Sequence, residues 1–173
     1  HVCFPSLPDM QPRTVLLGGF SKDYAMTGWR IGYALGPKDI ISGMIRVHQY
    51  TIMSAPTTAQ SAAVTALTDA APMVEEMRLE YDRRRKLIVG ELNRIGLPTF
   101  EPKGAFYCFP KVGVTGLDDE TFAHRLLNEE HVAIVPGNSF GAGGEGFCRC
   151  SYATSYEKLE EAIRRIEKFV NRL

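Results

Sequence analysis

The chain has 173 residues, 45% of them hydrophobic and 23% charged, which is an ordinary composition for a soluble globular protein. Its 20 basic and 20 acidic residues balance, so no net charge attracts nucleic acid or an anionic membrane. No apolar run approaches the ~18 residues that span a bilayer, and the first residues do not resemble a signal peptide, so we expect a cytoplasmic protein without nucleic-acid or membrane partners.

The first predicted elements are two short strands separated by a segment that contains a lysine and an arginine. Val15–Leu17 is typical of a buried strand that ends at a pair of glycines, and Ile31–Leu35 is typical of a second strand. Ser21, Lys22 and Arg30 lie between these strands. We therefore expect Lys22 and Arg30 on the same turn region.

These residue types match the chemistry of one kind of cofactor. A lysine amine forms a Schiff base with an aldehyde, and a guanidinium holds a phosphate through two parallel hydrogen bonds. The Ser21 hydroxyl can add a donor to the phosphate. Pyridoxal phosphate carries both groups, an aldehyde and a phosphate. For a lone lysine and arginine, however, an exposed lysine and a surface ion pair would be the commoner explanation.

Helices are predicted for most of the next part of the chain. Apolar spacing over Ile40–Val47 indicates an amphipathic helix, and Pro56 marks the start of another. A third helix of about 24 residues runs from Pro72 to Gly96, which is long for a globular protein and suits a segment that bridges two lobes. Its basic run at 82–86 is read as a solvated face rather than a phosphate or nucleic-acid site.

Beyond Gly96 the pattern changes to a compact α+β lobe. Strands are predicted over Gly104–Pro110, Val132–Val135 and Phe147–Tyr152, and helices over Asp118–Glu130 and from Thr154 to the C-terminus. The glycine-rich stretch Gly141–Gly146 precedes a strand instead of joining a strand to a helix, so we read it as a flexible connection and not as a nucleotide-binding loop.

Arg149 is the most unusual charged residue of this lobe. It lies within a predicted strand of otherwise apolar or small residues, where a permanent charge needs an anionic partner. A structural carboxylate is its simplest partner, and a bound anionic ligand is the functional alternative.

The cysteines and histidines show no spacing typical of a metal site. The four cysteines are Cys3, Cys108, Cys148 and Cys150. We expect them to be buried, reduced thiols rather than metal ligands or redox groups, and we expect the scattered histidines to be ordinary surface residues.

Several of these segments resemble class I/II aminotransferases, which are fold-type I pyridoxal-phosphate enzymes. Residues 21–33, which contain Ser-Lys and Gly-Trp-Arg-x-Gly-Tyr, resemble the cofactor-anchoring signature, and residues 147–153 resemble the segment that grips the substrate α-carboxylate. By this resemblance Lys22 carries the cofactor, Ser21 and Arg30 hold its phosphate, and Arg149 binds the substrate. Residues 104–107 and 136–141 also resemble segments of the family's small domain.

The resemblance implies an α/β fold of which this chain is the C-terminal portion. Residues 1–72 would complete a large mixed-sheet cofactor domain, and residues 73–173 would form the bridging helix and a small α+β domain. Family members are roughly twice as long. The aspartate, asparagine, tyrosine and stacking aromatic that tune the cofactor in the family are expected upstream, so we expect the isolated chain to be inactive.

For the full-length protein the resemblance implies an aminotransferase, a homodimer that moves an α-amino group from an amino acid to a 2-oxo acid. Two alternatives remain at this stage. A pyridoxal-phosphate C–S lyase would use Lys22, Arg30 and Arg149 equally well. A non-catalytic sensor built on an aminotransferase-like domain is the other, and such regulators usually carry a fused DNA-binding region.

Overall fold

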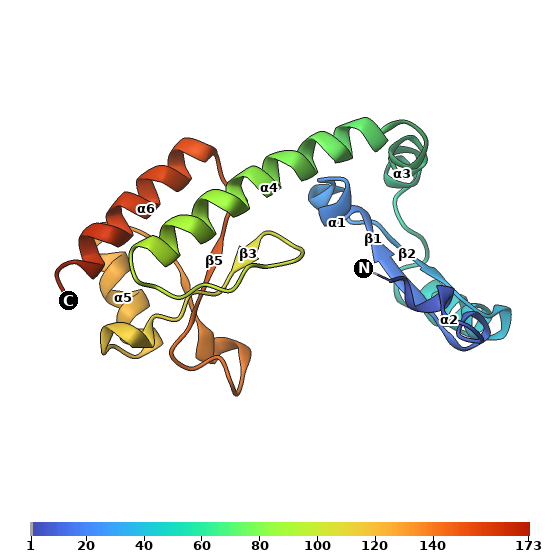
Figure 1. Cartoon of the computed structure of the whole chain (residues 1–173). Helices are drawn as coiled ribbons and strands as arrows, with labels where there is room; N and C mark the ends of the chain where they lie inside the picture. Colours follow the sequence, from blue (N-terminus) through green and yellow to red (C-terminus); the bar gives the residue numbers. More distant parts are fainter. Residues whose placement is uncertain (1) are drawn as a thin grey trace. The chain divides into compact units, whose positions relative to one another are not determined.

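A computed structural model describes residues 2–173, which divide after Glu76 into two compact units. The long helix α4 (Ala71–Arg94) begins in the first unit and continues into the second, and its bounds lie within two residues of the predicted ones (Figure 1). Within residues 2–173, no helix is both long enough and apolar enough to cross a membrane.

The first unit contains a two-stranded antiparallel sheet. Its elements are η1 (Phe4–Ser6), η2 (Gln11–Arg13), β1 (Leu16–Gly19), α1 (Phe20–Asp23), η3 (Thr27–Trp29), β2 (Gly32–Leu35), α2 (Lys38–Thr51) and α3 (Thr57–Asp69). The pairing runs from Leu16 opposite Leu35 to Gly19 opposite Gly32. The strand prediction was wrong at the glycines, because β1 continues through Gly18 and Gly19 instead of ending before them. A side chain at Gly18 would place its Cβ 2.2 Å from the Tyr33 ring, so a larger residue at this strand position would have to displace that ring.

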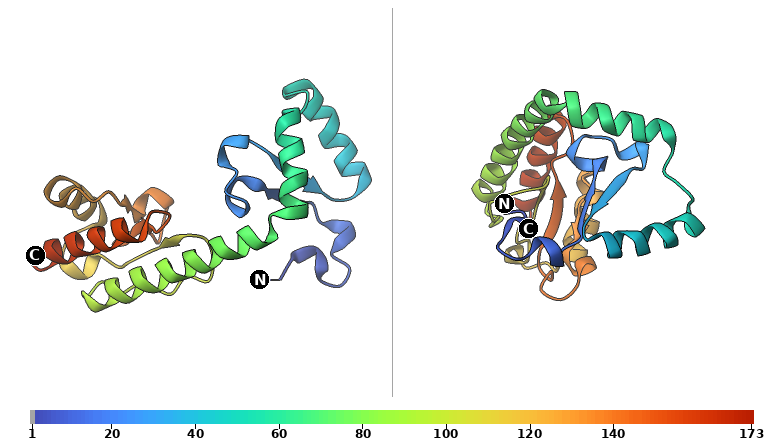
Figure 2. Two further views of the ribbon diagram at one scale, coloured as in Figure 1. Left: turned by 90° about the horizontal axis from the view of Figure 1, so that it is seen from above. Right: turned by 90° about the vertical axis from the view of Figure 1, so that its right-hand side faces the viewer.

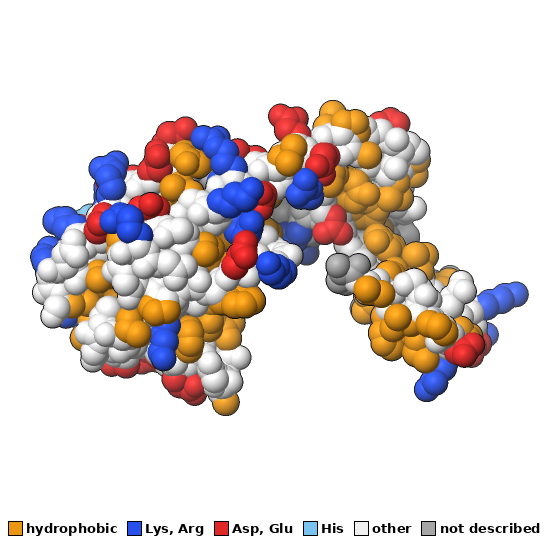
Figure 3. Space-filling model, viewed as in Figure 1, with side chains coloured by type: hydrophobic (Ala, Val, Ile, Leu, Met, Phe, Trp, Pro, Cys, Tyr) orange, Lys and Arg blue, Asp and Glu red, His pale blue; other side chains and the backbone are white. Residues whose placement is uncertain are grey.

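The core of the first unit is small. It consists of Phe20, Met26, Ala63 and Ala66, with partly buried neighbours around them. Helix α2 has the predicted apolar residues but no buried side chain, and Figure 3 shows hydrophobic side chains exposed over α2 and α3. Residues 2–76 therefore provide no cover for the apolar face that the sequence pattern indicates.

The second unit is a three-stranded sheet covered by helices, and it holds the larger core. Its further elements are β3 (Tyr107–Cys108), η4 (Gly113–Thr115), α5 (Asp119–Glu130), β4 (Val135–Pro136), η5 (Gly137–Phe140), β5 (Cys148–Ser151) and α6 (Tyr156–Val170). The strand order is β3-β5-β4, and both pairings are antiparallel. Helix α6 runs beside the second half of α4, and Ile88 and Leu92 of α4 share a core with Ile163 and Phe169 of α6 (Figures 1 and 2).

The predicted helices of this unit are accurate, whereas its strands are shorter than predicted. Only Tyr107–Cys108 and Val135–Pro136 pair with β5, because β5 itself has four residues and divides its length between two partners. The last helix begins at Tyr156 rather than at Thr154, and it is capped by Ser155, whose hydroxyl accepts from the Lys158 amide at 3.4 Å.

The basic run of α4 is neutralised by nearby carboxylates. Arg84 pairs with Glu80 at 2.8 Å, and Lys86 pairs with Asp82 at 2.7 Å. Arg85 lies between Asp82, at 2.7 Å, and a glutamate of the following loop. The charges of this run are thus paired within the chain, and its side chains are only partly solvated, because those of Arg84 and Arg85 are 20% and 18% exposed.

Three of the four thiols are buried, but the prediction for Cys3 was wrong, because that side chain is exposed. Cys148 and Cys150 alternate with outward positions along β5 and face the core, and Cys108 lies opposite Cys150 in the sheet register. Cys3 precedes a one-turn 3-10 helix that has no buried residue, so no core is available there to cover it.

Candidate cofactor and substrate sites

The predicted lysine lies where β1 passes into the short helix α1. Phe20 opens that helix and is only 3% exposed, and its amide donates to the carbonyl of Ile31 across the strand pair. The amide of Met26 in turn donates to the Phe20 carbonyl at 3.2 Å. A buried aromatic with hydrogen bonds on both sides thus fixes the backbone beside the exposed Lys22.

Thr27 connects Ser21 to Arg30. Its hydroxyl donates to the Ser21 carbonyl at 2.9 Å, and its own carbonyl accepts a 2.7 Å hydrogen bond from Arg30 Nη1. The structure therefore places Ser21, Lys22 and Arg30 on one hydrogen-bonded turn of the first unit.

The conformation of Arg30 is uncommon for a residue with a side chain. Its φ is +52°, in the left-handed region, which costs an ordinary residue about 1 kcal/mol or more and tends to occur where function requires it. No carboxylate of residues 2–173 forms an ion pair with this guanidinium, which is exposed. Most of the guanidinium's five donors are thus available to an anion.

The donor set of this turn fits pyridoxal phosphate. It offers an amine for an aldehyde, and a guanidinium and a hydroxyl for a phosphate. Positions Gly19 and Gly28 have open space where a Cβ would stand, so a ligand can approach the backbone there.

Arg149 lies in the central strand of the second unit, between two aromatic rings. Its guanidinium carbon is 4.5 Å from the centre of the Tyr107 ring and 4.7 Å from that of Phe140. No carboxylate of the described residues pairs with it, so a structural carboxylate, the simplest expectation, is not found within residues 2–173. The rings stabilise the cation and leave its N–H groups for an anion from outside residues 2–173.

Sequence reasoning missed the surroundings of Arg149. Tyr107 and Phe140 fall in segments that resemble the family, but nothing in their spacing indicated rings on either side of one guanidinium. Asp119 gave no signal, because an acidic residue in the first turn of a helix is common. It is nevertheless 4% exposed, and both of its carboxylate oxygens accept backbone hydrogen bonds from residues 138 and 146.

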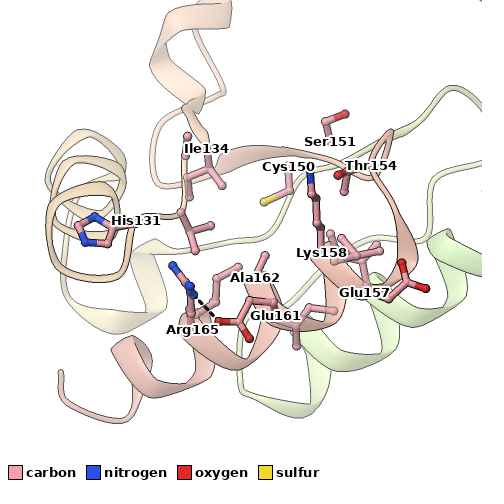
Figure 4. Close-up of a pocket in the computed structure, with 16 residues that line it drawn as sticks. His131, Ile134, Cys150, Ser151, Thr154, Glu157, Lys158, Glu161, Ala162 and Arg165 are labelled. Atoms are coloured by element: carbon pink, nitrogen blue, oxygen red, sulfur yellow. Dashed lines mark hydrogen bonds and ion pairs between the residues drawn. The ribbon is translucent and has the colours of Figure 1, made fainter.

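The second unit also contains a cavity of about 510 Å³ between α6, β5 and the segment 132–134 (Figure 4). Its lining combines apolar side chains, including Ile134 and Ala162, with polar ones, including His131, Lys158 and Arg165. None of the four predicted site residues lines it. The predicted chemistry therefore does not depend on this cavity.

Comparison with known proteins gives a consistent result along the whole chain. The family profile described as aminotransferase class I and II matches residues 5–166. The aspartate aminotransferase of Pyrococcus abyssi is 51% identical over 170 residues, and the aromatic-amino-acid aminotransferase 2 of Thermococcus litoralis is 49% identical over 165 residues. The crystal structure of the aromatic aminotransferase from Pyrococcus horikoshii superimposes with a TM-score of 0.96 at 49% identity.

The matches cover most of this chain but less than half of each relative. They include 97% of this chain and 44% of the Pyrococcus abyssi protein, and 99% of this chain and 46% of the Pyrococcus horikoshii structure. This coverage confirms an α/β fold that corresponds to part of the pyridoxal-phosphate-dependent fold. The chain belongs to the class I and II aminotransferase family.

Proposed function

We propose that the full-length protein is a pyridoxal-phosphate-dependent aminotransferase that moves an α-amino group from an amino acid to a 2-oxo acid. The observation that carries the proposal is the hydrogen-bonded turn that holds Ser21, Lys22 and Arg30, in a chain of this family. The aspartate and aromatic specificities of the relatives support amino acids as the substrate class.

Lys22 is the proposed catalytic residue. When bound, the cofactor supplies an aldehyde and a conjugated ring that takes up the electron pair left at the substrate Cα. As an unprotonated amine, Lys22 Nζ removes the Cα proton as general base, and as an ammonium it returns a proton as general acid. The buried Phe20 beside it limits the movement of the backbone from which this side chain extends.

The two arginines have different tasks in this proposal. Arg30, together with the Ser21 hydroxyl, holds the cofactor phosphate, and Arg149 holds the α-carboxylate of the substrate. The absence of an acidic partner for either guanidinium within residues 2–173 supports a ligand anion for both. With the carboxylate held, the Cα–H bond can be kept in the orientation that proton transfer requires.

The two alternatives are not favoured. Relatives that are 51%, 49% and 44% identical to this chain carry aminotransferase names, which speaks against a C–S lyase and against a sensor without catalysis. Purified full-length protein should transfer amino groups from glutamate, aspartate or phenylalanine to 2-oxo acids. Release of pyruvate from cystathionine without amino transfer would instead indicate a lyase, and neither activity would indicate a sensor.

The lysine assignment has a direct chemical test. Borohydride reduction of the full-length protein with its cofactor, followed by peptide mapping, should label Lys22. The Lys22→Ala variant should lose this label and amino transfer while keeping its secondary structure. A label on any other lysine would overturn the assignment.

We further propose that the protein is a cytoplasmic homodimer. Four cysteines without a disulfide among residues 2–173 suit a reducing compartment. The exposed apolar face of α2 requires cover, which the rest of the protein and a second subunit can supply. Sedimentation of the full-length protein at twice the monomer mass would support the dimer.

A further inference from the structure

We propose that Asp119 is a positioning residue for the substrate-binding Arg149, acting through the segment 137–146. The inference rests on the proposed function, because it assumes that Arg149 binds a carboxylate. It begins from a buried charge that the catalytic scheme does not use. The Asp119 side chain is 4% exposed, and no lysine or arginine of residues 2–173 forms an ion pair with it.

The Asp119 carboxylate is satisfied by backbone amides at the two ends of one segment. Oδ2 accepts from the Asn138 amide at 2.9 Å, and Oδ1 accepts from the Gly146 amide at 3.1 Å. The neighbouring Glu120 adds a 2.7 Å hydrogen bond from the Asn138 side chain. The first turn of α5 therefore holds both ends of the segment 137–146, which contains the glycine-rich stretch 141–146 that the sequence alone indicated as a flexible connection.

The segment is also closed on itself. Gly137 and Gly144 approach so tightly that a Cβ on Gly137 would lie 2.0 Å from the carbonyl oxygen of Gly144. The Gly137 amide donates to the Phe147 carbonyl at 2.8 Å. Backbones in such close contact leave few alternative arrangements, so the position of the segment depends on the contacts that fasten its ends.

Phe140 transmits this position to Arg149. It ends η5, and its ring centre lies 4.7 Å from the Arg149 guanidinium carbon and 6.2 Å from the Phe109 ring centre. Phe109 in turn stacks on Phe147 with ring centres 5.4 Å apart. The contacts thus run from the Asp119 carboxylate to Asn138, through η5 to the Phe140 ring, and from the ring to the guanidinium.

If Asp119 positions Arg149, its substitution should weaken carboxylate binding, which a purely stabilising role of Asp119 would not require. The Asp119→Asn variant keeps the shape of the side chain, but its amide N–H group faces one of the two backbone N–H donors that the carboxylate accepted from. That hydrogen bond is lost, so one end of the segment 137–146 is released. Phe140 then no longer restrains the guanidinium. Binding of a carboxylate at Arg149 should weaken by about tenfold, whereas binding of the cofactor by Lys22 and Arg30 should not change.

The experiment uses the full-length protein with its cofactor and the variants Asp119→Asn, Phe140→Leu and Asp118→Ala. Asp118 is the matched control, because it caps the same helix by accepting from the Thr121 amide at 2.8 Å and its side chain accepts no hydrogen bond from residues 137–146. Calorimetric titration with succinate and 3-phenylpropionate measures carboxylate binding without turnover. Amide hydrogen exchange over residues 137–146 reports on release of the segment.

The inference expects higher Kd values for the two carboxylates and a higher KM for the amino acid in Asp119→Asn and Phe140→Leu. The cofactor Kd should stay unchanged in both. Faster exchange over 137–146 should occur in Asp119→Asn only, and Asp118→Ala should lower the melting temperature without changing carboxylate binding.

Carboxylate binding within twofold of wild type in Asp119→Asn, together with faster exchange, would overturn the inference. If Asp119→Asn does not fold, Phe140→Leu decides, because that side chain is 52% exposed and its loss leaves the core intact. An Arg149→Lys variant tests the proposed function separately. Unchanged carboxylate binding in Arg149→Lys would refute the substrate assignment itself, whereas weakened binding there with no effect in Phe140→Leu would refute only the role of the Asp119 segment.

Discussion

The carboxylate of Glu130 accepts a 2.6 Å hydrogen bond from Arg172, which fastens the last turn of α5 to the chain just beyond α6. Glu130 is 5% exposed, and Lys168 Nζ donates to the same carboxylate, with a closest distance of 3.0 Å. The Arg165 guanidinium also donates to the backbone carbonyl of Glu130 at 3.0 Å. Two cations of the C-terminal segment thus meet at the Glu130 carboxylate, and a third binds the backbone carbonyl of the same residue.

Removal of this charge should destabilise the second unit. In Glu130→Gln, the two cations lose their shared carboxylate and a buried amide is left with poorer partners, so the melting temperature should fall by several degrees. The control is Glu129→Gln, because Glu129 is 36% exposed, pairs with Arg125 on the helix surface at 2.7 Å, and shares only a longer 3.4 Å contact with Arg172. If both substitutions lowered the melting temperature equally, the burial of Glu130 would make no additional contribution to the stability of the second unit.

Stability of the second unit should fall in acid. Hydrogen bonds from Lys86 and Arg85 lower the pKa of Asp82 to about 2, and the Asn138 and Gly146 amides lower the pKa of Asp119. A carboxyl group whose pKa is lower in the folded state than in the unfolded state stabilises the protein at pH values above its unfolded pKa of about 4. This stabilisation is lost as the pH falls through the folded pKa. The urea midpoint should therefore decrease between about pH 4 and pH 2, and less steeply in Asp82→Asn.

The helices of this chain could be predicted closely because their signals are local. Pro56 precedes α3 and Gly96 follows α4, where the glycine adopts a φ of +86° that other residues avoid. Strand length could not be predicted in the same way. Val132–Val135 is apolar and mostly β-branched, but pairing begins only at Val135, because the partner strand and its register lie elsewhere in the sequence.

The two candidate sites also differ in whether their residues are close together in the sequence. Ser21, Lys22 and Arg30 belong to one short segment, so their proximity could be predicted from sequence. The environment of Arg149 depends on Tyr107 and Phe140, which reach it through the sheet and through a turn that Asp119 holds. Such long-range contacts leave no periodic signal, and the sequence therefore indicated that Arg149 needs an anion without indicating what surrounds it.

Cys3 should be the only cysteine of this chain that reacts rapidly in the native state. Burial, reinforced by the charge of Asp119, raises the pKa of the Cys148 thiol to about 12, and a hydrogen bond with the Cys108 thiol, together with burial, raises that of Cys150. Because the thiolate is the nucleophile, these two side chains stay unreactive near neutral pH. Iodoacetamide labelling followed by mass spectrometry should modify Cys3 first and the others only after unfolding. Rapid native labelling of Cys150 would contradict the buried arrangement.

The charge-conserving variants Arg30→Lys and Arg149→Lys should have separable effects. Each keeps a cation but loses the planar pair of donors, which should cost about 1.4 kcal/mol, or about tenfold in affinity. Arg30→Lys should raise the cofactor Kd, measured by absorbance titration of the full-length protein. Arg149→Lys should lower kcat/KM for the amino acid with the cofactor still bound. An effect on the cofactor Kd from Arg149→Lys would mean that the two tasks are not divided as proposed.

Residues 1–173 produced alone should behave as an unstable fragment of the enzyme. Tyr50 of α2 is 94% exposed and Val47 is 69% exposed, so the first unit presents apolar surface that should bind the dye ANS. The second unit has its own core and should retain its helices in circular dichroism. Without the rest of the cofactor site, this fragment should bind pyridoxal phosphate weakly and show no amino transfer. Titration of the fragment and of its Lys22→Ala variant provides the measurement, and tight binding that requires Lys22 together with turnover would show that these 173 residues already form a complete site.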